Sequence, residues 1–247
     1  MTGTVASLWR HPIKSHGREE VHETTIAPGR TMPGDRVWAV AHEASRATGA
    51  AWSPCAEFTR VAKAPALMAI SARYDDGAGT VTLSHPGRPP LAFDPDAEPE
   101  ALIGWVAPLM PADRAAPARL VRVPDRGMTD TDYPSVTLCN LASHRAVEQR
   151  IGRPLSIHRW RGNVWIDGLA PWEEFDWVGR ELRAGDAVLR VRERAERCLA
   201  TTANPETGRR DADTLGALES WGHRDFAVLA EVVRGGTLRR GDAVAPL

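Results

Sequence analysis

The chain has 247 residues, of which 43% are hydrophobic and 26% are charged, which is typical of a globular protein with room for one large or two small domains. The formal net charge is −1, so no overall field attracts nucleic acid or a membrane surface, and we expect neither as a partner. No stretch approaches the roughly 20 apolar residues that a membrane helix needs. The N-terminus also lacks an apolar signal-peptide core, so the sequence predicts a cytoplasmic protein.

Short β-type runs, bounded by Gly, Pro, Asp or Asn, dominate the chain. The predicted strands are Thr4–Trp9, Val37–His42, Leu67–Arg73, Thr80–Ser84, Arg119–Val123, Ser156–Trp160, Asn163–Asp167, Ala187–Val191 and Phe226–Val233. Many short strands at modest spacing are typical of barrels and sandwiches. The pattern therefore predicts a mainly β (α+β) fold with few helices.

Two segments have helical patterns. Glu98–Met110 is interrupted by Gly104 and Pro108, whereas Leu141–Ile151 has clear end signals. Asn140 can cap its N-terminus, and Gly152 stands where a left-handed C-cap is expected.

A stretch rich in Pro, Asp and Ala, near residues 111–117, is the best candidate for a domain boundary. It predicts an N-terminal domain over residues 1–115 and a second domain over residues 116–247. Both lengths are normal for domains.

The three cysteines, Cys55, Cys139 and Cys198, form no C-x-x-C pair. Their odd number and wide spacing argue against a disulfide scaffold, a zinc knuckle or an iron–sulfur site within this chain. Cys139 lies in the apolar end of a strand, and Cys55 has no basic residue within two positions. We therefore interpret both as structural thiols.

Cys198 lies in a different setting, ERCLATTANPETGRRD. Arg197 and the nearby Arg194 favour a thiolate, which is the form that attacks an electrophile or binds a metal. Thr201 and Thr202 could donate to a sulfur or oxo group. From the residues alone, Cys198 could be a core thiol, a nucleophile or a metal ligand.

Basic and hydroxyl residues occur at the ends of two N-terminal strands. Lys14 and Ser15 follow the first strand in HPIKS, and Arg36 precedes the next in PGDRVWAV. Such groups suit a phosphate or another anion. A solvated lysine and an Arg36 paired with Asp35 would explain the same residues.

Two further blocks hold hydrogen-bonding side chains. In WRGNVWID, Arg161 and Asn163 suit an oxyanion or the edge of a heterocycle, or else an ordinary hairpin. In TDYPSVTLCN, Tyr133 and Ser135 flank Pro134 in a loop that leads into a strand.

Taken together, LWRHPIKS, PGDRVWAV, DYPSVTLCN, WRGNVWID and RCLATTANPETG resemble, in this order, the molybdenum cofactor sulfurase C-terminal (MOSC) family with its N-terminal β-barrel segment. The resemblance covers nearly the whole chain and is closest to the molybdoenzymes of the amidoxime-reducing component type. It implies a MOSC β-barrel packed with an N-terminal β-barrel-like domain. A molybdenum-molybdopterin cofactor would lie between the two.

The resemblance makes Cys198 the protein ligand to molybdenum. It implies cofactor contacts at Lys14, Ser15, Arg36, Tyr133, Pro134, Ser135, Arg161, Asn163, Arg197 and Cys198. The chemistry agrees, because soft metals favour thiolates and a phosphate favours Lys, Arg and hydroxyls. Glu196 departs from the family pattern, which often has a small hydroxyl residue there.

The function implied is reduction of small N-hydroxylated compounds such as amidoximes, hydroxamic acids and N-hydroxylated bases. Because the chain has neither a C-x-x-C pair nor a dinucleotide-binding glycine fingerprint, we expect electrons from a separate ferredoxin- or flavin-type donor. Two alternatives stay open. One is a sulfur carrier with a persulfide on Cys198, and the other is a MOSC fold that binds a ligand without the cofactor.

Overall fold

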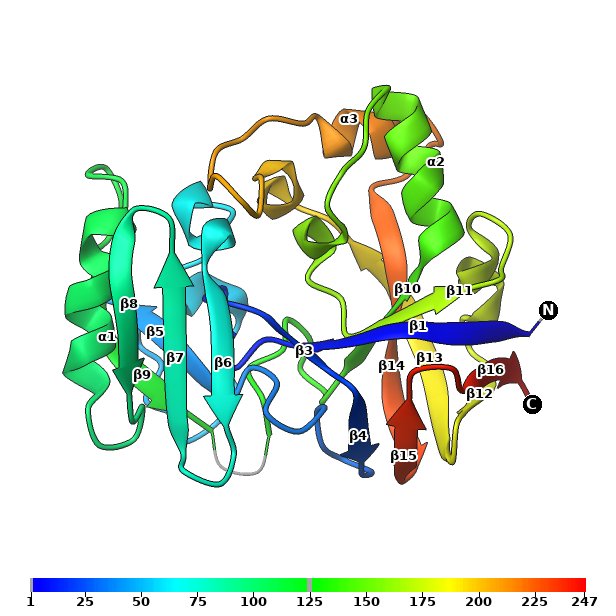
Figure 1. Cartoon of the computed structure of the whole chain (residues 1–247), viewed down its shortest axis with the longest axis horizontal. Coiled ribbons are helices and arrows are strands. Elements are labelled where there is room, and N and C mark those ends of the chain that lie inside the picture. The colour runs from blue at the N-terminus through cyan, green and yellow to red at the C-terminus, as the bar shows by residue number, and fades with distance from the viewer. Residues whose placement is uncertain (1, 124–125) are drawn as a thin grey trace.

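The computed structural model describes residues 2–123 and 126–247 and has two β-rich lobes side by side (Figure 1). In the barrel lobe, seven strands close on themselves in the order β11-β10-β14-β13-β12-β16-β1, and β1 pairs back onto β11. β3 extends the sheet beside β1. The bounds are β1 (Gly3–Arg10), β3 (Glu19–Val21), β10 (Val136–Asn140), β11 (Val164–Asp167), β12 (Glu181–Ala184), β13 (Ala187–Glu196), β14 (Asp225–Arg234) and β16 (Ala243–Pro246).

The N-terminal lobe has two three-stranded sheets and a helix. One sheet holds β2 (Ile13–Lys14), β5 (Trp38–His42) and β9 (Pro117–Arg122), and the other holds β6 (Ser71–Asp75), β7 (Thr80–His85) and β8 (Arg88–Phe93). Helix α1 (Pro99–Val106) packs on β8 and β9. A short pair, β4 (Glu23–Ile26) and β15 (Gly236–Arg239), connects the early chain to its C-terminal part.

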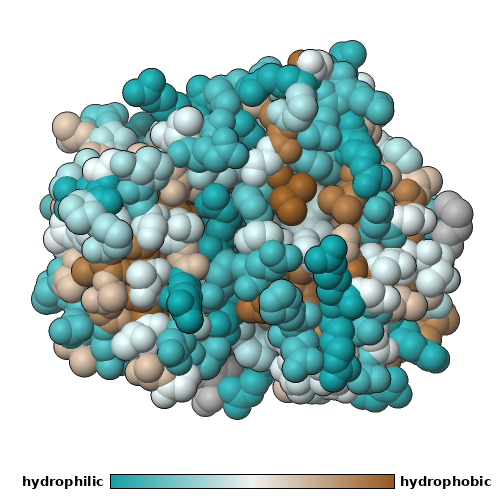
Figure 2. Space-filling view, viewed as in Figure 1, coloured by the Kyte–Doolittle hydropathy of each residue, from teal (hydrophilic) through white to brown (hydrophobic). Residues whose placement is uncertain are grey.

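The barrel is filled by side chains rather than hollow. Its core includes Leu8, Leu138, Val164, Leu189 and Val228, one from each of five strands and each at most 1% exposed. Alternation along the strands supplies this core, as in β12, where Leu182 and Ala184 are buried and Arg183 is exposed. The face of the molecule seen in Figure 2 is mostly hydrophilic, with small apolar patches.

Helix α2 (Leu141–Ile151) confirms the predicted span and both predicted caps. The Asn140 side chain accepts a hydrogen bond from the Ala142 amide at 2.8 Å, and Gly152 has the left-handed φ of 83°. α3 (Thr214–Glu219) has a similar cap, because the Asp213 carboxylate accepts from the Gly216 amide. Short 3-10 helices complete the fold: η1 (Cys55–Glu57), η2 (Pro65–Ala69), η3 (Ala107–Leu109), η4 (Ile157–Trp160), η5 (Glu173–Trp177) and η6 (Leu199–Thr202).

The structure confirms the mainly β fold but corrects some elements. Ser156–Trp160, predicted as a strand, is wrong, because the Ser156 hydroxyl accepts from the His158 amide and starts η4. The strand predicted over Leu67–Arg73 is wrong in its first half, because Pro65 starts η2, and β6 begins only at Ser71. The predicted helix Glu98–Met110 is α1 only as far as Val106, and Pro108 lies in η3.

Each lobe contains a strand from the part of the sequence that mainly forms the other lobe. β1, at the N-terminus, is part of the barrel, and β9, beyond residue 115, pairs with β5 in the N-terminal lobe. The division into residues 1–115 and 116–247 stays a prediction, because in space neither lobe is one continuous segment. None of the described helices combines the length and apolarity needed to cross a membrane.

Candidate functional site

A cavity of about 420 Å³ is lined by both lobes. The N-terminal lobe contributes Lys14, Ser15, Arg36 and the segment from Cys55 to Lys63, and the barrel side contributes residues of the 129–137 loop and strand, η4, and the end of β13. Three basic residues gather at one end, which we call the arginine end: Lys14, Arg36 and Arg161. The opening around Cys198 is the thiol end.

Arg161 defines the arginine end. It caps η4 with a left-handed backbone, φ 50°, and both terminal nitrogens of its guanidinium are buried without a hydrogen-bond partner among the described residues. Burial, and then the nearby Arg36 cation, lowers the pKa of Arg161 to about 9. The Asp35 and Asp130 carboxylates offset part of the cost of burying this cation, but neither pairs with its guanidinium among the described residues, so this position suits an anionic ligand.

Arg36 is held beside Arg161 by buried groups. Its Nη2 donates to the Arg161 carbonyl at 2.9 Å, and its Nη1 forms an ion pair with the Asp35 carboxylate. The other oxygen of Asp35 accepts from the His11 amide at 2.8 Å. Burial alone would raise the pKa of Asp35, but Arg36 and His11 keep it well below its usual range. Asp35 is therefore a carboxylate that orients Arg36.

Lys14 reaches the same end of the cavity. Its Nζ donates to the Met128 carbonyl at 2.7 Å and forms an ion pair with Asp130, whose side chain keeps 74% of its exposure. The Lys14 cation, with Arg36 and Arg161 farther away, lowers the pKa of the exposed Asp130 carboxyl. The charge of Lys14 is therefore already partly balanced by Asp130 before any anion binds here.

The backbone around this end is strained. Five non-glycine residues among those described have a left-handed φ, and three of them line the cavity: Ser15 at 66°, Arg36 at 53° and Arg161 at 50°. Side chains disfavour this conformation, and such outliers gather at binding sites, where surrounding structure fixes them.

Cys198 lies between the end of β13 at Glu196 and the start of η6 at Leu199, and its side chain is exposed. Its neighbour Arg197 is fixed by carbonyl groups. Nε of Arg197 donates to the Phe226 carbonyl at 2.8 Å, and Nη1 donates to the Trp160 carbonyl at 3.0 Å. Arg194 turns away and lies 4.3 Å from the Phe175 ring centroid. Only Arg197 therefore supplies the positive setting expected near Cys198.

The segment after Cys198 is folded onto the N-terminal lobe. Arg210 donates to the Ala62 carbonyl at 2.8 Å, and Arg18 donates to the Pro205 carbonyl at 3.2 Å. Gly208 has φ 67°, and a Cβ on it would lie 2.7 Å from the Cα of Ala66. The N-P-E-T-G sequence thus joins the segment after Cys198 to the N-terminal lobe.

The hydroxyl groups of Thr201 and Thr202, predicted to donate to a sulfur or oxo group, instead donate to backbone carbonyls at the start of η6. The Thr201 hydroxyl donates to the Cys198 carbonyl at 3.2 Å, and the Thr202 hydroxyl donates to the Leu199 carbonyl at 2.8 Å. Both side chains shape the turn that presents Cys198.

The structure brings seven of the ten predicted site residues to this cavity: Lys14, Ser15, Arg36, Ser135, Arg161, Arg197 and Cys198. Tyr133 and Pro134 are not among its lining residues, and the Tyr133 hydroxyl donates to Glu193 at 2.7 Å. Asn163 bonds to the Thr137 amide and the Trp9 carbonyl, so it joins strands. The cofactor role of each predicted residue stays a prediction.

Sequence reasoning missed several residues at this cavity, among them Cys55, Arg60, Asp130 and Arg159. Arg159 is 2% exposed and donates to the Thr202 carbonyl at 3.1 Å, so it supports η6. The sequence feature that could have identified Arg159 as a cavity residue is its position two residues before Arg161. No sequence feature could have identified Cys55 and Arg60, because only the fold brings their segment to the cavity that Cys198 lines.

Cys139 is confirmed as a core thiol. It is fully buried, and burial raises its pKa to about 12. A Cβ on Gly162 would lie 2.1 Å from the Cys139 sulfur. The glycine next to Arg161 is thus required by close packing.

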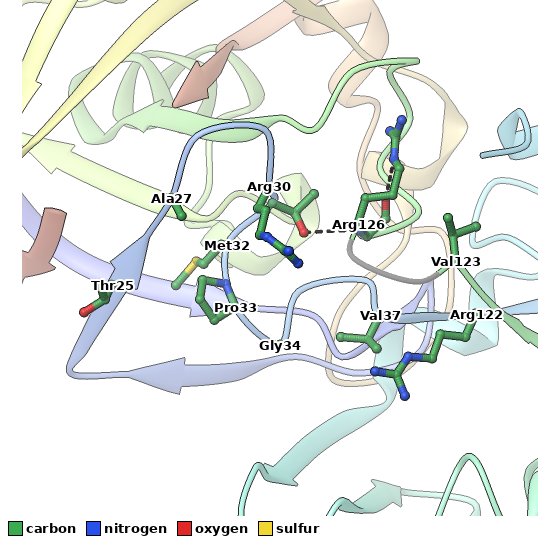
Figure 3. Close-up of a pocket in the computed structure, with 12 residues that line it drawn as sticks. Thr25, Ala27, Arg30, Met32, Pro33, Gly34, Val37, Arg122, Val123 and Arg126 are labelled. Atoms are coloured by element: carbon green, nitrogen blue, oxygen red, sulfur yellow. Dashed lines mark hydrogen bonds between the residues drawn. The ribbon is translucent and has the colours of Figure 1, made fainter. Parts of the chain in front are cut away.

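A second pocket, of about 320 Å³, shares no described lining residue with the Cys198 cavity. Figure 3 shows Arg30, Arg122 and Arg126 among its lining residues, together with Met32, Pro33 and Val123. Its described lining contains no carboxylate, histidine or cysteine. It therefore lacks the groups that would make it the reactive site.

Family comparison agrees with this geometry. A family model described as the MOSC N-terminal beta barrel domain matches residues 2–104, and one described as the MOSC domain matches residues 126–245. The chain belongs to the MOSC family. MOSC domains are associated with binding of the molybdenum cofactor. The MOSC chain is also similar to mitochondrial amidoxime-reducing component 1 of Mus musculus, with 26% identity over 250 residues, 89% of this chain and 71% of that protein.

Among solved structures, the MOSC chain is similar to the YUAD protein from Bacillus subtilis, with a TM-score of 0.47 and 11% identity over 99% of this chain and 94% of that one. It is also similar to YiiM from Geobacillus stearothermophilus, with a TM-score of 0.36 and 19% identity over 45% of this chain and 53% of that one. The family assignment rests on the two family models.

Proposed function

We propose that this protein is a molybdenum-cofactor-dependent reductase of N-hydroxylated compounds. One observation carries the proposal: the buried, unpartnered guanidinium of Arg161 and the exposed thiol of Cys198 line the same cavity. An anion for the first and a soft metal for the second are both parts of a molybdenum-molybdopterin. The 26% identity to an amidoxime-reducing component supports the reaction class.

The cofactor phosphate would bind at the arginine end, to Lys14, Arg36 and Arg161. Ser15 and Ser135 would add hydroxyl groups there, and Cys198 would be the metal ligand. Three of the predicted residues would act indirectly, by holding the loops that carry these groups in place: Tyr133, Pro134 and Asn163. When bound, the cofactor supplies the two-electron chemistry that breaks the N–O bond.

The protein's own residues position the parts of this reaction. Arg197, held by the Trp160 and Phe226 carbonyls, fixes the backbone at Cys198. Trp160 stacks on Phe226 at 3.8 Å between centroids and makes one wall rigid. For a hydroxylamine-type group, R–NH–OH takes up two electrons and two protons and gives R–NH₂ and water. We propose a ferredoxin- or flavin-type protein as the electron donor.

A second candidate is a sulfur carrier with a persulfide on Cys198. The exposure of that thiol favours it, because transfer needs an accessible sulfur. A separate desulfurase would have to load the persulfide.

The deciding experiment measures molybdenum per chain in protein from a host that makes the cofactor, and then turnover of benzamidoxime with reduced methyl viologen. Near-stoichiometric molybdenum with benzamidine formation is the expected result. Loaded protein that reduces no amidoxime or hydroxamate would refute the reductase. A gain of 32 Da on Cys198, without molybdenum, would favour the sulfur carrier.

A further inference from the structure

Basic side chains outnumber acidic ones around the Cys198 cavity. Its described lining contains seven lysines and arginines but only two carboxylates, those of Asp130 and Glu196. Five of the basic groups have a partner or a proposed ligand. Arg159 pairs with Asp211, Arg197 bonds to carbonyls, and Lys14, Arg36 and Arg161 form the arginine end. The remaining two are Arg60 and Lys63.

Arg60 and Lys63 lie on one turn of the N-terminal lobe. The amides of Lys63 and Ala64 both donate to the Arg60 carbonyl at 2.9 Å. A turn of this kind brings side chains three positions apart to the same side. The turn is fixed from two directions, because Val61 is 1% exposed in the lobe's core and the Ala62 carbonyl accepts from Arg210.

The two cations lack an acidic partner. The half-buried Arg60 has one side-chain hydrogen bond among the described residues, from Nη1 to the Cys55 sulfur at 3.2 Å. Lys63 is exposed and forms no ion pair within the described chain. Arg60 is thus oriented within the cavity wall by the Cys55 sulfur, and it keeps donors for a ligand.

We propose that the substrate carries a carboxylate, which Arg60 and Lys63 bind while its N-hydroxylated group faces Cys198. This inference rests on the proposed function and adds the substrate class. A carboxylate can accept two bonds from the Arg60 fork and one from the Lys63 ammonium. The substrate would share the cavity of about 420 Å³ with the cofactor, which restricts it to a small aromatic or aliphatic acid. Arg60 lines the cavity beside Cys55, so the geometry favours a small molecule over an acidic protein surface.

The test compares benzamidoxime with 4-carboxybenzamidoxime, using holoenzyme and reduced methyl viologen, so that no protein donor is needed. We expect the acid to have a KM at least about tenfold lower, as one or two charge-assisted contacts would give. The double variant Arg60→Gln, Lys63→Gln should raise the KM of the acid about tenfold more than that of benzamidoxime. Arg73→Gln, which changes an exposed arginine on β6, should leave both KM values as in the wild type.

Equal KM values for the two substrates, or equal effects of the double variant on both, would overturn the proposal. An effect seen only with a protein electron donor would also overturn it, in favour of a docking surface for that donor. If neither compound is reduced, the proposed function fails and the anion site is tested by calorimetry. Tighter binding of 4-carboxybenzamidine than of benzamidine, lost in the double variant, supports the site, and equal binding refutes it.

Discussion

The arginine end and the thiol end of the cavity are built in opposite ways. At the arginine end, Ser15, Arg36 and Arg161 have strained backbones, and the cations are buried against Asp35. At the thiol end, Cys198 is exposed, and its neighbour Leu199 keeps 51% of its exposure. The first is preorganised for an anion, because its carboxylates Asp35 and Asp130 pair with Arg36 and Lys14 and leave Arg161 without an ion pair among the described residues. The second is open, as a position that must admit a reactant needs to be.

The two ends also differ in what supports them. Arg36 is oriented by a buried carboxylate, whereas Arg197 is oriented by the carbonyls of Phe226 and Trp160. Carbonyls fix a guanidinium without neutralising it, so Arg197 keeps its charge beside Cys198. Substitutions at the arginine end should therefore change cofactor retention, and substitutions at the thiol end should change turnover.

The largest expected effect is that of Cys198→Ser. Serine is nearly isosteric, so the protein should fold, but its oxygen is a harder and less acidic ligand for a soft metal. Changes to groups that only support metal ligands cost about 10–100-fold. Loss of the ligand itself should lower turnover by about a hundredfold or more, measured per bound molybdenum with benzamidoxime.

Cys55→Ser is the matched control, because Cys55 lines the same cavity from the other lobe. It should keep turnover of benzamidoxime within a few-fold of wild type, since we assign it no role at the metal. Turnover per molybdenum in Cys198→Ser that equals the wild-type rate would rule out Cys198 as the ligand.

The next effect is loss of cofactor from Arg36→Gln and Arg161→Gln. Each change removes a charge-assisted contact of about 1.5–3 kcal/mol, which corresponds to about 10–150-fold in affinity. Molybdenum and pterin content should fall in each variant after dialysis. Arg183→Gln, an exposed change on β12, is the control and should retain the wild-type content. Full occupancy in the Arg36→Gln, Arg161→Gln double variant would contradict the phosphate placement.

The sequence predicts the barrel and α2 well because their signals are local. The β-type run of β13, and the Asn140 and Gly152 caps, need no tertiary context, whereas β8, β12 and β16 were not predicted as strands. It fails for residues 156–160, where apolar residues suggest a strand but the Ser156 cap starts a 3-10 turn. β3, β4 and β15 are too short, and have too few apolar residues, to be seen in the pattern.

The site is predictable in part for a similar reason. Lys14, Arg36, Arg161 and Cys198 lie in blocks whose resemblance to the family predicts their roles, although Arg36 next to Asp35 has an ordinary ion-pair explanation on its own. The left-handed backbone at Arg36 and Arg161 is invisible in the sequence, since any residue there could have been extended. Arg60 was missed because it reaches the cavity only through the packing of the two lobes.

Arg161→Gly should stabilise the protein without cofactor while preventing cofactor retention. Glycine adopts a φ of 50° without strain, and the change also removes a buried cation that forms no ion pair among the described residues. We expect a gain of about 1–3 kcal/mol in the free energy of unfolding, measured with urea. Ala227→Gly relieves similar strain at φ 71° without removing a charge, so it separates the two causes. A less stable apoprotein in Arg161→Gly would mean that the arginine end is not strained.

The smallest effect is a pH dependence of stability. Burial, with Arg161 and Arg36 nearby, lowers the pKa of His11 to about 3, and burial lowers the pKa of His16 to about 4. In the unfolded chain a histidine has a pKa of about 6.5. Below that pH the unfolded state binds protons that the folded state does not, so stability falls as the pH decreases from 6.5 towards 4.

Each of these histidines should cost about 1–2 kcal/mol of stability between pH 7 and pH 5, measured by urea unfolding. The depressed pKa of Asp35 adds nothing in this range, because that carboxylate is charged in both states until the pH falls below its unfolded value. His11→Gln should reduce the loss, and His22→Gln, at an exposed position, should not. The same pH dependence in His11→Gln and wild type would mean that His11 can be protonated in the fold. The arginine end would then be less tightly closed to protons than its contacts imply.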